Sequence, residues 1–389
     1  MLYYYYIIHR QEKAMHKTKE RPKSRAERIF RALWIFIPLI PAAAMYFVLP
    51  YFPQVAEYVF ARGIFKAVTV PLGFLTSLVP ISLTELLAVL ALPLAVTLII
   101  VLARRLKKSR DRKKTALRAA RGTAAFLSFA CLMYMICHGA NFYRLPAEQL
   151  MELDTSPKTA EHLLRVCGEL AANAAREREN LPENENGEMT LPEDIFTELT
   201  RTGSGYDALT EDYPYLWTSV FRQKPVMLSE AWSYTLITGM YFPFFAECNV
   251  NTAQPDYSIP FTAAHESAHS RGIAFENECN FYAFLSCINS EYAEFRYSGY
   301  LEAFVYCANS LYSYDKDMWR QAYSLCTDGM RADLAANSRY IDEHRGRVEQ
   351  AASSINNGFI RSQGVKDGTL SYGRVTELIL AYYDKIWNE

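Results

Sequence analysis

The chain has 389 residues, enough for one or two domains and a sizeable core. Its 41 basic and 42 acidic residues nearly cancel, but residues 142–389 hold 20 Lys and Arg against 36 Asp and Glu, a formal charge of −16. This acidic region argues against a nucleic-acid-binding protein, because such proteins usually concentrate basic residues in their globular part.

The N-terminal region is basic and then apolar. Residues 9–31 hold nine Lys and Arg, and residues 29–52 form an apolar run that reaches the length of about 20 residues needed to cross a bilayer. The run is long, lies behind some 28 residues and lacks a small-residue cleavage site, so we do not expect a cleaved signal peptide. We expect a basic tail over residues 1–28, with Met1 and Met15 both candidate starts, followed by a membrane helix.

Two further apolar runs, residues 83–103 and 122–142, also have the length of membrane helices. They flank residues 104–121, which hold ten Lys and Arg, whereas residues 53–82 hold only two. Three segments of full length disfavour the alternative, a buried apolar hairpin in a soluble protein. The sequence therefore predicts a three-helix transmembrane region over residues 29–142.

The charge distribution predicts the orientation of these helices. If all three cross the bilayer, the N-terminal tail and the basic loop lie on the same side, which the positive-inside rule makes cytoplasmic. We therefore expect a multi-pass protein of the cell membrane with the lipid bilayer as a partner. Its C-terminal domain, residues 143–389, is expected to be extracytoplasmic.

The C-terminal domain reads as mainly α with a small β-sheet. The spacing of apolar residues predicts an amphipathic helix over residues 155–181, and the polar residues 182–194 predict a loop. Residues 232–251 are rich in aromatic and β-branched side chains and predict strand, whereas helices dominate from residue 261, including a long one over 331–357. Six cysteines in this domain permit up to three disulfides, whose pairing stays open.

The stretch "FTAAHESAHSRGIAFENEC", residues 261–279, contains His265, Glu266 and His269 in the spacing H-E-x-x-H. On a helix both imidazoles lie on one face and can bind one cation, while Glu266, about 100° away, reaches a water molecule beside it. The alternative is a surface helix with two partly buried histidines, because the spacing arises by chance in roughly one chain per hundred of this length.

A catalytic zinc site needs three protein ligands and one open position. A third histidine six residues after the motif is excluded, because that residue is Phe275. The next predicted helix begins with two acids, Glu276 and Glu278, and each is a candidate ligand. Acids in the first turn of a helix also complement its dipole without binding a metal, so the residues alone leave the third ligand open.

The segment "HESAHSRGIAFENECNFYAFLSC" resembles the gluzincin class of zinc peptidases, and its "ENECNFYAF" is similar to the element E-x-E-A-N-x-x-A that supplies the third ligand in short members. The resemblance implies a zincin-like fold and Zn²⁺ bound by His265, His269 and Glu278. More widely, "GMYFPFFAECNVNT", "FRYSGYLEA" and "SYGRVTELILAYY" behind three membrane helices resemble an uncharacterised bacterial family, a domain of unknown function. Cys248 and Cys279 stand where that pattern has Ala, and the two cysteines could bond to each other or bind metal.

The resemblance implies a membrane-anchored zinc metallopeptidase that hydrolyses a peptide or protein substrate, with Glu266 as general base. Candidate oxyanion donors are Arg296, Tyr297, Tyr300, Tyr372 and Arg374. Zincins commonly place a sheet edge beside the cleft, so substrate contacts are expected from Glu247, Asn249 and Asn251, which could equally cap turns. The alternatives are a catalytically silent sensor that signals through the membrane helices, and a transporter, which the scarcity of intramembrane charge disfavours. Substrate, cleavage mode and oligomeric state are not indicated.

Overall fold

The computed structural model describes residues 24, 33–217, 221–362 and 372–388. The chain forms two compact units, one of Met1–Ala43 with Leu102–Leu132 and one of Ala44–Val101 with Met133–Glu389. The second unit contains the sheet and the helices that follow it. It does not coincide with the expected domain 143–389, because two apolar segments, residues 44–101 and 133–142, belong to the same unit.

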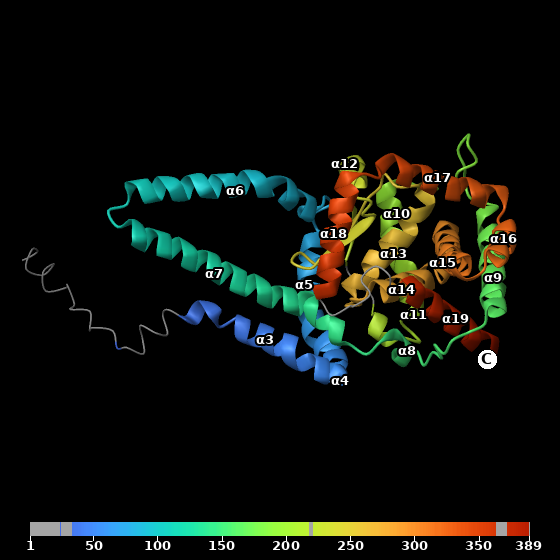
Figure 1. Ribbon diagram of the computed structural model, residues 1–389, viewed down its shortest axis with the longest axis horizontal. Coiled ribbons are helices and arrows are strands. Elements are labelled where there is room, and N and C mark those ends of the chain that lie inside the picture. Colours follow the sequence, from blue (N-terminus) through green and yellow to red (C-terminus); the bar gives the residue numbers. More distant parts are fainter. Residues whose placement is uncertain (1–23, 25–32, 218–220, 363–371, 389) are drawn as a thin grey trace, which may run out of the picture. The chain divides into compact units, whose positions relative to one another are not determined.

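Helices near the N-terminus have the length and composition of membrane spans (Figure 1). Four such stretches occur in the described residues: Trp34–Tyr51, Pro53–Ser77, Leu83–Lys108 and Arg112–Cys137. The second of them was not expected as a span. In chain order the helices are η1 (Trp34–Phe36), α3 (Leu39–Val48), η2 (Leu49–Tyr51), α4 (Pro53–Val55), the π-helix η3 (Ala56–Phe65), α5 (Lys66–Ser77), α6 (Leu83–Lys108) and α7 (Arg112–Cys137).

The rest of the chain is mainly helical, as expected. Helices α13, α14 and α15 pack on one another, α9 packs on α15, and their buried apolar side chains form the main core. The helices are η4 (Gly139–Tyr143), α8 (Ala147–Leu150), α9 (Ala160–Arg178), α10 (Ile195–Arg201), α11 (Gly203–Leu209), η5 (Pro214–Leu216), α12 (Ser229–Ser233), η6 (Asp256–Ser258), α13 (Ile259–Ser270), α14 (Glu276–Ile288), α15 (Ala293–Tyr314), α16 (Lys316–Ser324), α17 (Asp328–His344), α18 (Arg347–Ser362) and α19 (Tyr372–Asn388).

Side-chain caps fix several of these helix starts. Thr159 accepts a hydrogen bond from a backbone amide in the first turn of α9, and Thr327 does so for α17. The single helix expected over 331–357 is two helices, because the backbone turns extended at Arg345, with ψ of 130°.

The sheet has three short strands, β1 (Gln223–Pro225), β2 (Gly239–Phe242) and β3 (Glu247–Val250), in the order β1-β3-β2. β3 pairs with β1 in parallel and with β2 antiparallel, with Gly239 opposite Val250. The expected edge strand, the one that carries Glu247 and Asn249, is therefore the central strand. The edge strand beside α13 is β2, which packs on that helix.

A buried ion pair joins the sheet to the start of α6. The Lys224 ammonium lies 2.6 Å from the Glu247 carboxylate and donates to the carbonyls of Thr76 and Ile81, at 2.9 and 3.1 Å. Glu247 also accepts from the backbone amide of Thr84 at 2.9 Å and from its hydroxyl at 2.7 Å. Both charged side chains are at most 1% exposed. All three ammonium donors are thus satisfied, and residues 76–84 are part of the globular unit.

A second buried ion pair joins η3 to the end of α13. The Arg144 guanidinium contacts both carboxylate oxygens of Glu57, at 2.7 and 3.0 Å, and donates to the carbonyl of Gly272 at 2.7 Å. The side chain of Glu57 is fully buried and that of Arg144 is 6% exposed. Two parts of the apolar segment 44–101, at Glu57 and at residues 76–84, are therefore held to the globular unit by buried charge pairs.

Candidate metal centre

The H-E-x-x-H sequence lies on α13, and the chain turns directly into α14. Gly272 has a φ of +80°, a left-handed conformation that favours glycine, and its amide bonds to the carbonyl of His269. This turn brings the first residues of α14 back over the C-terminal half of α13. The sequence thereby places Glu276 beside both histidines.

Both imidazoles are oriented by an acceptor on Nδ1. His265 Nδ1 lies 2.7 Å from Asn280 Oδ1, and His269 Nδ1 lies 2.9 Å from the carbonyl of Ile273. A carbonyl oxygen can only accept, so Nδ1 carries the hydrogen in each ring. The Nε2 atoms are left for a common partner. This arrangement is typical of histidines that bind a metal through Nε2 with the other nitrogen held by the protein.

The common partner of the two Nε2 atoms is Glu276. One carboxylate oxygen lies 3.1 Å from His265 Nε2 and the other 3.7 Å from His269 Nε2. These distances bracket the separation of about 3.3 Å between two ligand atoms of a tetrahedral zinc site, given bonds of about 2.0–2.1 Å. Burial opposes charge on both groups, but their contact outweighs it, raising the pKa of His265 to about 9 and lowering the pKa of Glu276 to about 2. Without a metal, the His265 imidazolium and the Glu276 carboxylate therefore stabilise each other's charged forms, and a cation would have to displace the proton on His265.

Glu278 does not face the imidazoles. Its carboxylate accepts a hydrogen bond of 2.9 Å from the backbone amide of Ala147, and burial raises its pKa to about 7. Glu278 stands two residues after Glu276, about 200° around the helix, so the two carboxylates point to different sides of α14. The geometry thus replaces Glu278 by Glu276 as the candidate third ligand, and it gives Glu278 the role of holding the segment that follows Arg144.

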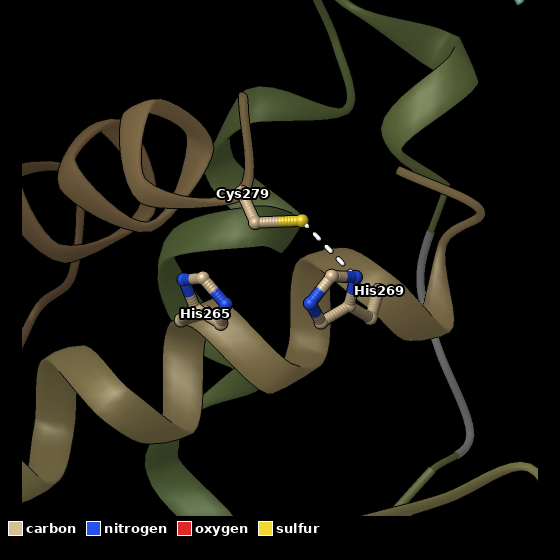
Figure 2. Close-up of side chains that lie close together, drawn as sticks. All are labelled: His265, His269 and Cys279. Carbon is tan, nitrogen blue, oxygen red and sulfur yellow. Dashed lines mark hydrogen bonds between the residues drawn. The ribbon is translucent and has the colours of Figure 1, made fainter. Parts of the chain in front are cut away.

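Cys279 points its sulfur toward the ring of His269 (Figure 2). Its sulfur is 3.2 Å from His269 Nδ1, and potential ligand atoms of His265, His269 and Cys279 lie within 4.8 Å of one another. That nitrogen already donates to Ile273, and in the metal-free chain burial raises the pKa of the Cys279 thiol well above its usual value. Because the sulfur lies at Nδ1 of His269 whereas Glu276 lies at Nε2 of both histidines, we take Glu276 as the candidate third ligand.

Cys248 and Cys279 do not bond to each other. Cys248 donates to the backbone carbonyl of Glu266 at 3.2 Å, so Cys248 and Cys279 are engaged separately. All eight cysteines of the chain are described and are free thiols in this structure.

Glu266 is buried between α13 and β2. Its side chain is 4% exposed, and a Cβ added at Gly239 would lie 2.5 Å from Oε1, so only glycine lets the strand pass this closely. The amide of Tyr241 donates to the carboxylate, while Oε2 is buried without a hydrogen-bond partner among the described residues. Burial, with the nearby charge of Glu276, raises the pKa of Glu266 to about 8.

Two further polar side chains border the site that the sequence did not single out. The His138 ring lies 5.9 Å from the His269 ring, and the Tyr241 ring stacks on His269 at 6.4 Å. His138 is 9% exposed, and the buried Tyr241 hydroxyl has no hydrogen-bond partner among the described residues. The sequence did not indicate His138 as a site residue, because it lies in the expected membrane helix 122–142. In the structure His138 follows directly after α7.

Other residues expected at the site are engaged elsewhere. Asn249 donates to the Thr84 hydroxyl at 3.2 Å and Asn251 to the Ser233 hydroxyl at 3.1 Å, so these residues and Glu247 hold the sheet together and do not face a substrate. The candidate oxyanion donors are also dispersed. Tyr297 donates to Asp333, Arg296 pairs with Glu177, Tyr300 packs near Phe284, Arg374 is exposed in the first turn of α19, and the side chain of Tyr372 lies outside the described part.

Comparisons with known proteins give a family but no activity. No curated protein and no solved structure matches the chain. One family model, described as a protein of unknown function and designated DUF3810, matches residues 60–380. That match covers most of the chain, including the apolar helices from η3 onward and the whole candidate metal centre, and so the chain belongs to the DUF3810 family.

Proposed function

We propose that this protein is a membrane-anchored zinc metallopeptidase, with His265, His269 and Glu276 as the zinc ligands. The observation that carries the proposal is the convergence of two Nε2 atoms on one carboxylate while both Nδ1 atoms are held by acceptors. Two imidazoles and a carboxylate are a known ligand set of catalytic zinc, which keeps a fourth position open. Glu276 is 43% exposed, so the ligand set lies open to solvent on its carboxylate side.

The zinc ion would supply the Lewis acid that polarises a peptide carbonyl and acidifies a water molecule. Glu266 then accepts the proton of the attacking water and delivers it to the leaving amine. The free Oε2 of Glu266, together with its raised pKa, suits a group that gains and loses a proton. Gly239 keeps β2 close enough to hold this carboxylate in place.

The peptide would lie along β2, and a side chain from this face would stabilise the oxyanion. β2 is the edge strand next to Glu266, and an extended peptide can add to such an edge through backbone hydrogen bonds. Burial raises the pKa of Tyr241 well above its usual value, so its unpaired hydroxyl remains a donor. Tyr241 and His138 replace the donors expected from the sequence.

Zinc content tests the ligand set. In the purified full-length chain we expect one zinc per molecule, retained in Glu278→Gln and lost in Glu276→Gln, as measured by elemental analysis after dialysis. The Glu278→Gln protein is the matched control, because both changes remove one carboxylate from the same helix turn. Zinc lost with Glu278 and kept without Glu276 would reverse the assignment.

Hydrolysis tests the activity. A fluorogenic library of random hexapeptides, incubated with full-length protein in detergent, should be cleaved by the wild type but not by Glu266→Gln, which should keep its zinc. Removing one oxyanion donor should lower kcat by about 10²–10³, so Tyr241→Phe and His138→Phe are predicted to keep zinc and lose rate. Equal turnover in Glu266→Gln and wild type would refute Glu266 as the general base, whereas no turnover by the zinc-loaded wild type would favour a catalytically silent sensor.

A further inference from the structure

The segment Pro53–Ser77 is long and apolar enough to cross a membrane, yet both of its ends are bonded to the globular unit. Near its start, Glu57 pairs with Arg144. At its end, the Thr76 hydroxyl donates to the carbonyl of Phe245 at 3.0 Å, and the Thr76 carbonyl accepts from Lys224. A helix that touches the same globular body at both ends lies on that body. It does not cross the bilayer away from it.

Figure 1 agrees with this placement, because α5 runs across the direction of α6 and not alongside it. Removing this segment from the spans leaves Trp34–Tyr51, α6 and α7, the number of crossings that the basic clusters require. By the positive-inside rule, three crossings would leave the residues that follow α7 on the extracytoplasmic side.

The two sides of this segment have reversed polarity. The side turned to the globular unit is buried and carries small and polar residues together with two phenylalanines, a stripe of Glu57, Phe60, Ala61, Phe65, Thr69, Gly73 and Thr76. A Cβ added at Gly73 would overlap the Phe221 ring, so the contact is close. The outward side carries the large apolar residues, namely Tyr58, Val59, Ile64, Phe74, Leu75 and Leu78, which are 44–66% exposed. An exposed apolar side over a buried polar stripe is the pattern of a helix that faces lipid.

A neighbouring loop extends this apolar surface. Met227 and Leu228 are 77% and 52% exposed, and their backbone amides donate to the carboxylate of Glu85 in the first turn of α6, at 2.9 and 2.7 Å. The loop therefore lies where a candidate span leaves the globular unit. We call the outward side of residues 58–78 together with Met227 and Leu228 the apolar sole.

The candidate metal centre borders the same elements. At Gly272, three residues after His269, an added Cβ would lie 3.1 Å from both the Phe65 ring and the Arg144 guanidinium. The loop after β2 is held by Thr76 through Phe245. His138, which adjoins His269, is the first residue after α7. The end of the metal-binding helix, the end of the edge strand and the His138 side of the site thus all touch segments that enter or face the bilayer.

We infer that the apolar sole rests on the outer leaflet and that the site acts on the membrane-proximal part of polypeptides that are themselves anchored in the bilayer. The occupant of the sole is lipid, because Met227 and Leu228 are bonded to the first turn of α6, a candidate membrane span. The substrate class rests on the proposed function, since it assumes peptide hydrolysis. A peptide that lies along β2 at this surface runs close to the headgroups, so anchoring holds it at a high local concentration.

Spin labels test the position of the sole without any catalysis. Cys131 is the exposed cysteine of the eight, so Cys131→Ser gives a background for Leu75→Cys and Met227→Cys, with Tyr314→Cys, 78% exposed at the end of α15, as control. In liposomes of phosphatidylethanolamine and phosphatidylglycerol, labels at residues 75 and 227 should collide more with oxygen than with a water-soluble nickel chelate. The label at residue 314 should show the reverse. The inference would be overturned if the labels at residues 75 and 227 collided more with the nickel chelate than with oxygen, or collided rarely with both reagents.

Matched free and membrane-anchored substrates test the proposed substrate class. The fluorogenic hexapeptide library is presented either free or fused to a membrane-spanning leucine and alanine helix, with full-length protein in the same liposomes. At equal total concentration, the anchored library should be cleaved at least tenfold faster, and detergent should remove the difference. Equal rates in liposomes would overturn the substrate class alone. Cleavage of neither library by a zinc-loaded chain would refute the proposed function and the substrate class together, whereas the spin-label result stands independently.

Discussion

Replacing Glu57 by Gln should destabilise the globular unit and loosen the end of α13. The change leaves the Arg144 guanidinium, which is 6% exposed, without the carboxylate that it contacts at 2.7 and 3.0 Å. Breaking a buried ion pair by removing one partner costs about 3–5 kcal/mol. Glutamine keeps the shape and one acceptor oxygen, so we expect a loss of about 3 kcal/mol in the free energy of unfolding. That is a large share of the roughly 5–15 kcal/mol that stabilises a typical protein.

The free energy of unfolding can be measured on the full-length protein in mixed micelles, from the tryptophan fluorescence as the fraction of denaturing detergent rises. Glu179→Gln, an exposed carboxylate at the end of α9, should change the free energy by less than about 0.5 kcal/mol. Arg144→Met combined with Glu57→Gln removes both charges, so the double variant should be more stable than the sum of its single changes. A loss below about 1 kcal/mol for Glu57→Gln would refute the view that this pair holds the apolar segment to the unit.

Three further predictions concern the surroundings of the site. Asn280→Ala should weaken zinc binding by about 10–100-fold in competition with a fluorescent chelator, because it frees a histidine ring, whereas Asn277→Ala should not. Gly239→Ala should keep zinc yet lose hydrolysis of the peptide library, because the added methyl group displaces Glu266; loss of zinc instead would mean a collapsed site. Cys279→Ala should retain one zinc per chain by elemental analysis, and a zinc-free variant would make the sulfur a ligand.

The sequence was informative where local rules decide the outcome. Apolar helices of spanning length appear at all three predicted places, and the described fold is mainly helical with a small sheet. The H-E-x-x-H spacing placed two histidines on one helix face, because helical periodicity alone determines that relation. Zinc binding and hydrolysis stay predictions.

The sequence was less informative about charged residues whose ion-pair partners lie far away in the chain. Residues 53–82, with Arg62 and Lys66 as their only basic residues, were expected to be the loop between two spans. In the structure they are helical, and Glu57 pairs with Arg62 and with Arg144, 87 residues later. Likewise, Glu247 was expected to contact a substrate, whereas it forms a buried ion pair with Lys224 beside the start of α6. Such pairings depend on tertiary contacts that no local pattern contains.

The choice between Glu276 and Glu278 shows the same limit at the scale of one helix turn. Both acids suit the start of a helix, and the resemblance to zinc peptidases favoured Glu278. Which one faces the imidazoles depends on the rotation of α14 about its axis, and the described contacts indicate what sets that rotation: Asn280 must reach His265, and Glu278 must reach the amide of Ala147. With those two contacts made, about 200° of helix separates Glu278 from Glu276 and turns Glu276 toward α13. Ala147, ten residues after the candidate span α7 ends at Cys137, thus helps to select the candidate metal ligand, which links the position of the site to the apolar segments that hold it.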